Sequence, residues 1–128
     1  SMKKITYVLV ILLMVVILVS CTAEEPAVQV VEAYLNAVVD QDDVTLQKLV
    51  CEEWQFDAMM EMDSFLAVNP QLQDLSCSVV EDTGDSQLVN CTGNILATYN
   101  EEQQEIDLSL RNYIVNEVSG EWLVCGHQ

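Results

Sequence analysis

The sequence predicts an α+β domain, and three observations lead to this fold class. Up to about residue 66, apolar residues recur at the spacing of an amphipathic helix. From Leu72 onward, apolar and polar residues alternate, which is the period of a strand with one buried face. The change falls at Asn69-Pro70, where a proline ends the helical conformation. Helices followed by consecutive strands form an α+β domain, and 128 residues suffice for one.

Three helices are expected, over residues 26–41, 44–50 and 52–66. Pro26 suits the first position of a helix, and an aspartate of the Asp40–Asp43 turn is expected to cap the second helix. The faces expected to be buried carry Ala27, Val30, Val31, Tyr34, Leu35 and Val38 on the first helix, Leu46, Leu49 and Val50 on the second, and Trp54, Ala58, Met62 and Phe65 on the third.

Four antiparallel strands are expected to follow, with turns at residues 82–85, 100–103 and 119–121. The last strand covers residues 122–126. The expected inward positions are Leu75, Cys77 and Val79, then Val89, Cys91, Gly93, Ile95, Ala97 and Tyr99, then Ile106, Leu108, Leu110, Ile114 and Val118. On that alternation Asn112 and Asn116 are inward polar positions of the third strand.

The charge excludes one class of partner. The chain has a formal net charge of −17, and only Lys48 and Arg111 are basic after Cys21, against all 21 acidic residues. A surface this negative repels nucleic-acid phosphates, so binding of DNA or RNA is excluded.

The N-terminal residues have the layout of an export signal. Lys3 and Lys4 precede an apolar run of 15 residues that ends in Ser20-Cys21. The segment Leu18-Val19-Ser20-Cys21 resembles the bacterial lipobox, which implies cleavage before Cys21 and lipid on its sulfur. We therefore expect a lipoprotein signal peptide over residues 1–20, a lipidated cysteine and tether over 21–25, and the domain over 26–128. The alternative is an uncleaved signal anchor.

This layout implies a location in the cell envelope, on the extracytoplasmic side of the membrane. The five residues of the tether reach at most about 17 Å, so the domain is expected to stay close to the bilayer. The membrane, contacted through the lipid anchor, is thus the first expected partner.

Four cysteines remain beside Cys21, an even number in an exported protein. A hairpin centred on Gly84 places Cys77 directly opposite Cys91, within disulfide range. The next hairpin, centred near residue 102.5, pairs Cys91 with Ile114 and puts Cys125 a whole strand away. The prediction is therefore Cys77–Cys91 and Cys51–Cys125. Its weak point is the final strand, where Trp122 and Val124 compete with Leu123 and Cys125 for the inward face. A zinc site or a redox-active pair would be expected to show a CxxC spacing, which the sequence lacks.

Two short stretches add a family resemblance. Val30-Val31-Glu32-Ala33-Tyr34-Leu35-Asn36-Ala37 and the terminal Gly120-Glu121-Trp122 resemble the nuclear transport factor 2-like superfamily. The resemblance implies a cystatin-like α+β roll, in which three N-terminal helices pack on a curved four-stranded sheet. It also implies a choice of function, because the superfamily contains isomerases, dehydratases and proteins that only bind.

The resemblance gives Tyr34 a candidate catalytic role. It matches a tyrosine that donates a hydrogen bond to a developing oxyanion in steroid isomerases, and Asp57 is near the spacing of their base. No acid occupies an inward position of the third strand, and the only histidine, His127, lies near the chain end. A buried carboxylate bonded to Tyr34 would favour an enzyme.

The function predicted from these residues is non-catalytic binding of a small apolar ligand or an envelope protein. An isomerase or dehydratase, or a structural subunit of an envelope assembly, are the alternatives. No cofactor and no metal are expected, and the sequence indicates no oligomeric state. A pocket with a phenol and two amides would orient a neutral ligand. If the two amides face solvent, this pocket is excluded. The expected pocket residues are Tyr34, Trp54, Tyr99, Asn112 and Asn116.

Overall fold

The computed structural model describes residues 2–8 and 24–128. Residues 2–8 are helical, and the domain begins with α2 at Pro26. Among the described residues, no helix combines the length and apolar character needed to cross a bilayer. Cys21 and most of the apolar N-terminal run lie outside the described residues, so the signal peptide and the lipidation site remain sequence predictions.

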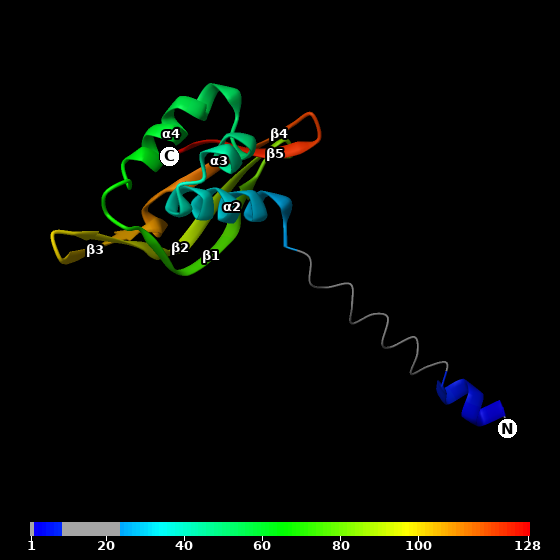
Figure 1. The fold of residues 1–128 in the computed structure, drawn as a ribbon. Helices are drawn as coiled ribbons and strands as arrows, with labels where there is room; N and C mark the ends of the chain where they lie inside the picture. The colour runs from blue at the N-terminus through cyan, green and yellow to red at the C-terminus, as the bar shows by residue number, and fades with distance from the viewer. Residues whose placement is uncertain (1, 9–23) are drawn as a thin grey trace.

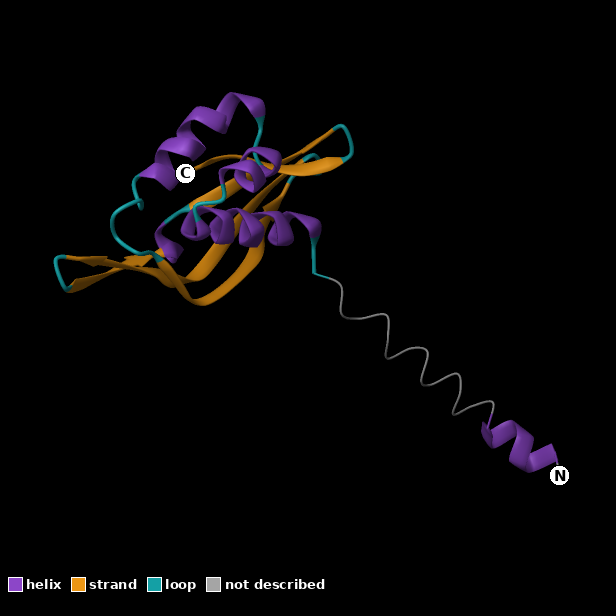
Figure 2. Ribbon diagram, viewed as in Figure 1, coloured by secondary structure: helices purple, strands orange, loops and turns teal. Residues whose placement is uncertain are grey.

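Three helices lie on one side of a curved antiparallel sheet (Figures 1 and 2). This is the expected α+β roll, but the sheet has five strands where four were predicted. The elements are α2 Pro26–Asp40, α3 Asp43–Leu49, the 3-10 turn η1 Glu52–Trp54, α4 Gln55–Asp63, β1 Gln71–Asp82, β2 Ser86–Tyr99, β3 Glu102–Asp107, the 3-10 turn η2 Leu108–Leu110, β4 Asn112–Val118 and β5 Glu121–His127.

The helix boundaries follow local backbone chemistry. Pro26 opens α2, and Gln41 ends it in the left-handed conformation, with φ 56°. The side chain of Asp42 then caps α3 by accepting a hydrogen bond of 3.1 Å from the backbone N–H of Thr45. The predicted capping is confirmed. The third helix is shorter than expected, because the chain leaves the helix after Asp63 in a series of turns.

The core lies between the helices and the concave face of the sheet. Every predicted inward position of the helices is buried except Leu49, which is partly exposed. Tyr34 and Leu35 of α2 are fully buried, together with Val89 of β2 and Val115 of β4. Among the described residues, every buried hydrophobic one lies between Ala27 and Val124, so the core seen in the structure is formed within residues 24–128.

The long strand β2 organises the sheet. It pairs with β1 along one edge, and along the other edge its first half pairs with β4 and its second half with β3. The sheet order is therefore β1-β2-β4-β5, with β3 beside the far end of β2. The β2–β3 hairpin extends beyond the helices (Figure 1).

The predicted alternation of the third strand is wrong after Leu108. Asn100 and Glu101 form a tight turn with φ of 50° and 68°, so Val89, and not Cys91, lies in the stretch paired with β4 and faces Tyr113. The 3-10 turn η2 then interrupts the strand, with Asp107 accepting a hydrogen bond from the Ser109 N–H at 2.9 Å. A shift of one residue moves every following side chain to the opposite face.

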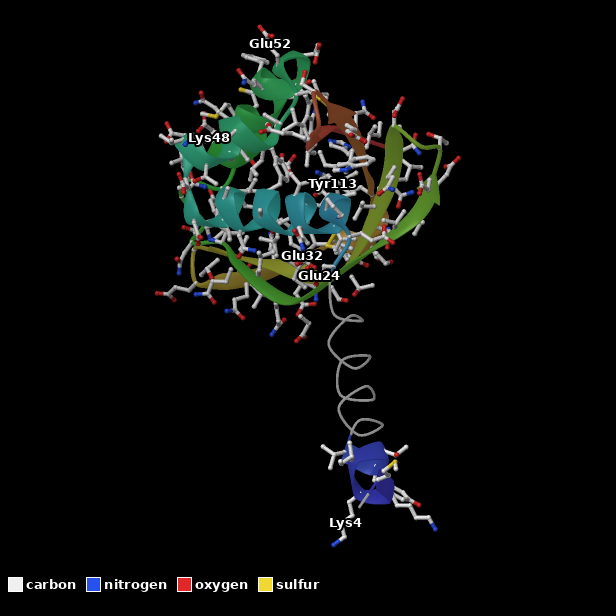
Figure 3. The ribbon with its side chains drawn as sticks, turned by 90° about the vertical axis from the view of Figure 1, so that its right-hand side faces the viewer. Lys4, Glu24, Glu32, Lys48, Glu52 and Tyr113 are labelled. Atoms are coloured by element: carbon white, nitrogen blue, oxygen red, sulfur yellow. A yellow bond between two sulfur atoms is a disulfide. The ribbon has the colours of Figure 1, made fainter. Side chains whose placement is uncertain are left out.

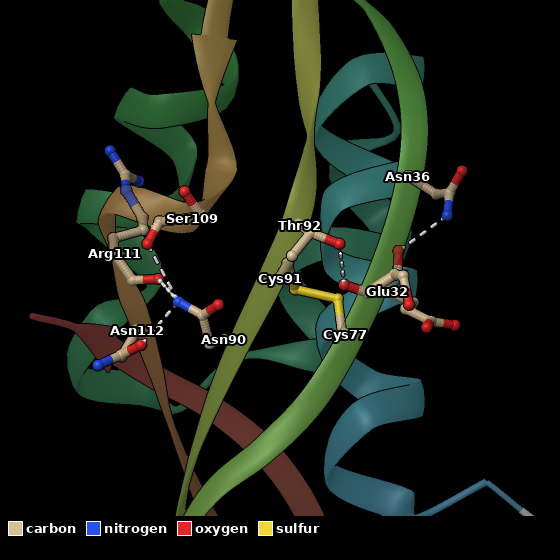
Figure 4. The surroundings of a disulfide bond; sticks show 10 residues. Glu32, Asn36, Cys77, Asn90, Cys91, Thr92, Ser109, Arg111 and Asn112 are labelled. Atoms are coloured by element: carbon tan, nitrogen blue, oxygen red, sulfur yellow. Dashed lines mark hydrogen bonds between the residues drawn. A yellow bond between two sulfur atoms is a disulfide. The ribbon is translucent and has the colours of Figure 1, made fainter.

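Both predicted disulfides are present in the structure. Cys77 lies directly opposite Cys91 in the β1–β2 register, with Cα atoms 4.0 Å apart (Figure 4). Cys51 joins Cys125 at a Cα separation of 4.9 Å, and the Cys51 N–H donates to the Val124 carbonyl at 2.9 Å. The second bond therefore ties the segment after α3 to β5, although Val124, not Cys125, is the fully buried residue of that strand.

Gly93 is required where β2 passes a bulge of β1. Its φ is 104°, and a Cβ at this position would lie 2.5 Å from the carbonyl oxygen of Gln73 and 2.6 Å from that of Asp74. The register of β1 shifts between Gln73 and Ser76, and Asp74 itself has φ 56°. Only a residue without a side chain allows the two backbones to approach this closely.

Gly93→Ala is therefore expected to lower the free energy of unfolding by about 3 kcal/mol or more, from backbone strain and the backbone clash together. Gly84→Ala is the matched control. Gly84 has φ 95° but no atom within 4 Å of the added Cβ, so a loss of only about 1 kcal/mol is expected from strain alone. Urea denaturation measures both values, and equal losses would contradict a close approach at Gly93.

Removing either disulfide should lower stability, and the disulfide that closes the longer loop should cost more, because the entropy of loop closure grows with the logarithm of loop length. The chain-entropy estimate gives about 3 kcal/mol for Cys77–Cys91 and about 4.5 kcal/mol for Cys51–Cys125, whose sequence separations are 14 and 74. Paired Cys→Ala variants, unfolded in urea, test this order. A non-reducing peptide map with any other pairing would refute the assignment.

Candidate functional site

A cavity of about 680 Å³ opens between α4, the middle of β2, the β3–η2 segment, β4 and the end of β5. Its walls are mainly apolar, and its charged and aromatic polar groups come from four of these elements. The apolar residues are Phe65, Ile95, Ile106, Leu108 and Leu110. The charged and aromatic polar residues are Glu61, Glu105, Asp107, Arg111, Tyr113 and His127.

Glu61 is the central residue of the polar part of the cavity wall. Its Oε2 accepts a hydrogen bond of 3.1 Å from the Tyr34 hydroxyl, and its Oε1 forms a 3.1 Å ion pair with Nη1 of Arg111. The Glu61 side chain is 17% exposed, so it faces the cavity without being fully buried. The Glu61 carboxylate thus connects three parts of the fold: α2 through Tyr34, α4 to which it belongs, and, through Arg111, the residue that precedes β4.

Four aromatic side chains pack against one another next to the Tyr34–Glu61 contact. The Tyr34 ring lies 5.5 Å from that of Trp54 and 5.8 Å from that of Tyr113, in tilted contacts. The His127 ring meets Trp54 and Tyr113 edge-on, at 5.8 and 6.4 Å. His127 belongs to β5 and pairs with Tyr113 in the β4–β5 register, so the sheet holds this residue in place although it lies near the chain end.

The two tyrosines stay protonated at neutral pH. Burial raises the pKa of Tyr113 to about 12, the Glu61 charge adds to the shift, and Arg111 opposes it. Burial and the Glu61 charge raise the pKa of Tyr34 as well. Each hydroxyl is therefore a hydrogen-bond donor. Tyr34 donates to Glu61, whereas no described residue accepts the proton of the buried Tyr113 hydroxyl.

The predicted pocket residues do not come together at this cavity. Tyr34 and Trp54 are buried as part of the core, and Tyr34 contributes only through Glu61. Tyr99 is 58% exposed, because it ends β2 in the protruding hairpin. Asn112 and Asn116 lie on the face of β4 opposite Tyr113, since η2 shifts the alternation by one residue.

Asn112 instead lies on the outer face of the sheet. Its Oδ1 accepts a hydrogen bond of 2.9 Å from Nδ2 of Asn90, which also donates to the carbonyl oxygens of Ser109 and Arg111 (Figure 4). These bonds fasten the η2–β4 junction to β2. The amide predicted to bind a ligand thus has a structural role, and the predicted pocket of two amides is wrong.

The candidate base Asp57 is exposed on α4, one turn before Glu61. The residues that the sequence analysis missed are Glu61, Arg111 and Tyr113. The sequence contains one indication of this site, because Arg111 is one of only two basic residues after Cys21. The other basic residue, Lys48, lies at the periphery of the helix layer (Figure 3).

The arrangement offers no evident metal site. Across residues 2–8 and 24–128, no cluster of three or more His, Cys, Asp or Glu side chains has the geometry to hold an ion. Glu61, which lines the cavity, accepts from Tyr34 with one oxygen and binds Arg111 with the other.

Comparison with solved structures defines the class of fold. A proposed dehydratase of the NTF2-like family from Streptomyces avermitilis matches with a TM-score of 0.52 and 19% identity, over 77% of this chain and 88% of that one. A proposed ketosteroid isomerase from Shewanella frigidimarina matches with a TM-score of 0.54 and 11% identity, over 79% and 91%. No family model and no curated protein matches the sequence.

The domain therefore has the NTF2-like fold that the sequence resemblance implied. At these identities the similarity concerns the fold alone, and the chemistry of the site has to be argued from its own residues.

Proposed function

We propose that this protein is a membrane-anchored, extracytoplasmic lipoprotein whose domain binds a small molecule in the cavity beside Glu61 without converting it. The observation that carries the binding role is the cavity itself. About 680 Å³ lies within the size of small-molecule sites, and apolar walls with a few converging polar groups are their usual lining. An open cavity of this kind also disfavours the purely structural role, which would be better served by a filled interior.

Glu61 supplies the carboxylate bonded to Tyr34 that the sequence analysis associates with an enzyme, although its side chain is 17% exposed. We infer binding over catalysis from the way its contacts are arranged. The Tyr34 hydroxyl donates to Glu61, so its proton is not available to a developing oxyanion. Glu61 accepts from Tyr34 with one oxygen and binds Arg111 with the other, so a substrate proton would have to compete with these contacts for the carboxylate. The two groups that an isomerase would use satisfy each other.

Anchoring is supported by the sequence before the domain. The basic start, the apolar run and the Ser20-Cys21 junction are in the order of a lipoprotein signal. The domain begins at Pro26, so a lipid on Cys21 would hold it next to the bilayer.

A second candidate function is an isomerase or dehydratase. The specific observation in its favour is Glu61, a carboxylate within hydrogen-bonding distance of Tyr34 and lining the cavity. The two structural neighbours described as a proposed dehydratase and a proposed ketosteroid isomerase fit this candidate at the level of the fold. Loss of the Arg111 contact on substrate binding would free one oxygen of Glu61 to act as a base.

Lipidation is tested by expression with the native signal in a bacterial host. The wild-type protein should enter the detergent phase on phase separation, and Cys21→Ala should remain in the aqueous phase, because its sulfur cannot carry the diacylglycerol. An unmodified full-length mass for protein from the membrane fraction would contradict the anchor.

Ligand binding is tested with Nile red, a neutral dye that fluoresces in apolar surroundings. The wild-type domain should enhance its fluorescence, and Ile106→Trp, which places an indole in the cavity wall, should weaken dye binding at least roughly fivefold by occupying the cavity. Val80→Trp on β1 is the control, because Val80 is 56% exposed and does not line the cavity. Equal dye binding by both variants would locate the site elsewhere.

Catalysis is tested by α-proton exchange of benzylacetone in D₂O, followed by NMR. A binding protein should leave the exchange rate at its value in buffer. An accelerated rate that Glu61→Gln abolishes and Glu105→Gln preserves would establish the second candidate, since both carboxylates line the cavity but only Glu61 contacts Tyr34.

A further inference from the structure

We propose that the cavity takes a carboxylate with an apolar body, and that the Arg111 guanidinium and the His127 imidazole bind the carboxylate. Both side chains belong to the cavity lining, and Arg111 is the basic residue of that lining. This inference rests on the proposed binding function and names the class of small molecule that the same cavity takes.

The strand register places Arg111 and His127 close together on the concave face. Tyr113 pairs with His127 across β4 and β5. Arg111 lies two residues before Tyr113, and its backbone is extended, with φ −134° and ψ 152°, so its side chain leaves the sheet on the same face as Tyr113. Arg111 and His127 are thus diagonal neighbours, which lie roughly 7–8 Å apart and within reach of long side chains. One carboxylate can therefore contact both.

Arg111 retains donors that a ligand can reach. Nη1 donates to Oε1 of Glu61 at 3.1 Å, and the guanidinium also lies beside the Tyr113 hydroxyl. A guanidinium has five N–H donors, so these two contacts leave most of them for another acceptor. The Arg111 side chain is 36% exposed, whereas Tyr113 is fully buried. The planar array of donors in a guanidinium matches the two oxygens of a carboxylate.

The cavity lining also exposes apolar surface next to Arg111 in the chain. Leu110 is 83% exposed and Ile106 is 38% exposed, and both line the cavity. A ligand whose carboxylate meets Arg111 would cover these side chains with its body, and the apolar area removed from water would add to the affinity. The expected ligand is therefore an amphipathic organic acid, and an inorganic anion would leave this surface uncovered.

The charges around the cavity have to be compatible with an anion. Glu61 and Arg111 form an ion pair, so a carboxylate on Arg111 does not face an unpaired Glu61. Glu105 and Asp107 also border the cavity, but they flank Ile106 on β3, so their side chains leave the strand on the opposite face. The net charge of −17 repels an anion from a distance, and physiological salt largely screens charges more than about 8 Å away. The nearby donors therefore decide the preference.

Three probes of similar shape test the charge class on the domain of residues 24–128, within which the core is formed. Hydrocinnamate is the carboxylate, benzylacetone is the neutral methyl ketone of the same skeleton, and phenylpropylammonium is the cation. NMR titration at neutral pH and physiological ionic strength should give hydrocinnamate an affinity roughly fivefold above that of benzylacetone, the ratio that one partly exposed ion pair provides. Phenylpropylammonium should bind most weakly.

Arg111→Gln should remove the preference for hydrocinnamate, and its binding of benzylacetone shows that the variant is folded. Lys48→Gln is the matched control, because it removes the same charge from the other basic residue of the domain, which lies away from this cavity, and it should keep the wild-type ratio. His127→Phe keeps a ring against Trp54 and Tyr113 but has no ring N–H, so it should reduce the preference in part.

Glu61→Gln should change the affinity in the opposite direction. The amide keeps an oxygen acceptor for Tyr34 and Arg111 but removes the negative charge that competes with the ligand for the guanidinium. Hydrocinnamate should therefore bind Glu61→Gln more tightly than the wild-type domain. A purely structural role of the ion pair would not raise the affinity for the anion alone.

The outcomes separate the two proposals. If the probes bind without a preference for hydrocinnamate, or if Arg111→Gln keeps the preference, the carboxylate class is wrong and the binding function stands. If Lys48→Gln loses the preference to the same extent, the effect comes from overall charge and the inference falls. An unchanged preference in His127→Phe would overturn the role of the imidazole. If Arg111→Gln does not fold, Glu61→Gln decides, because an unchanged or weaker affinity for hydrocinnamate overturns the inference. If no probe binds, the binding function and the inference both fail.

Discussion

The bend of β2 is the constraint on which the rest of the domain depends. At Gly93 the strand passes so close to the bulge of β1 that a Cβ would meet two carbonyl oxygens, and this contact curves the sheet. The bend also separates the partners of β2, because β4 pairs before it and β3 pairs after it. The concave face that results receives α2, and the gap between β3 and β4 is bridged by η2.

The candidate site is a consequence of that bridge. The 3-10 turn places Leu108 at the wall of the cavity and turns the Tyr113 side chain inward, while Asn90 holds the junction from the outer face. Glu61 on α4 then closes the arrangement by bonding Tyr34 and Arg111. One carboxylate thus joins the helix layer to the sheet at the edge of the cavity.

The two disulfides support opposite sides of this arrangement. Cys77–Cys91 crosslinks the first hairpin just before the bend, and Cys51–Cys125 fastens the helix layer to the last strand near His127. A domain of this size buries only a limited core, and crosslinks that restrict the unfolded chain add to its stability.

The sequence by itself determined the fold class and the helical stripes, which follow from periodicity, and the Cys77–Cys91 disulfide, which follows from the pairing of neighbouring strands; Cys51–Cys125 is the pair that then remains. It did not determine the site. The sequence pattern treats Leu108–Leu110 as part of a continuous strand with alternating inward and outward side chains. It therefore predicts Asn112 and Asn116 in the interior, where the structure has Tyr113. Glu61 and Arg111 are 50 residues apart, and only the packing of α4 against the bent sheet brings them to one cavity. Local patterns record which face of an element is apolar, whereas the tertiary structure decides which polar groups meet at its edges.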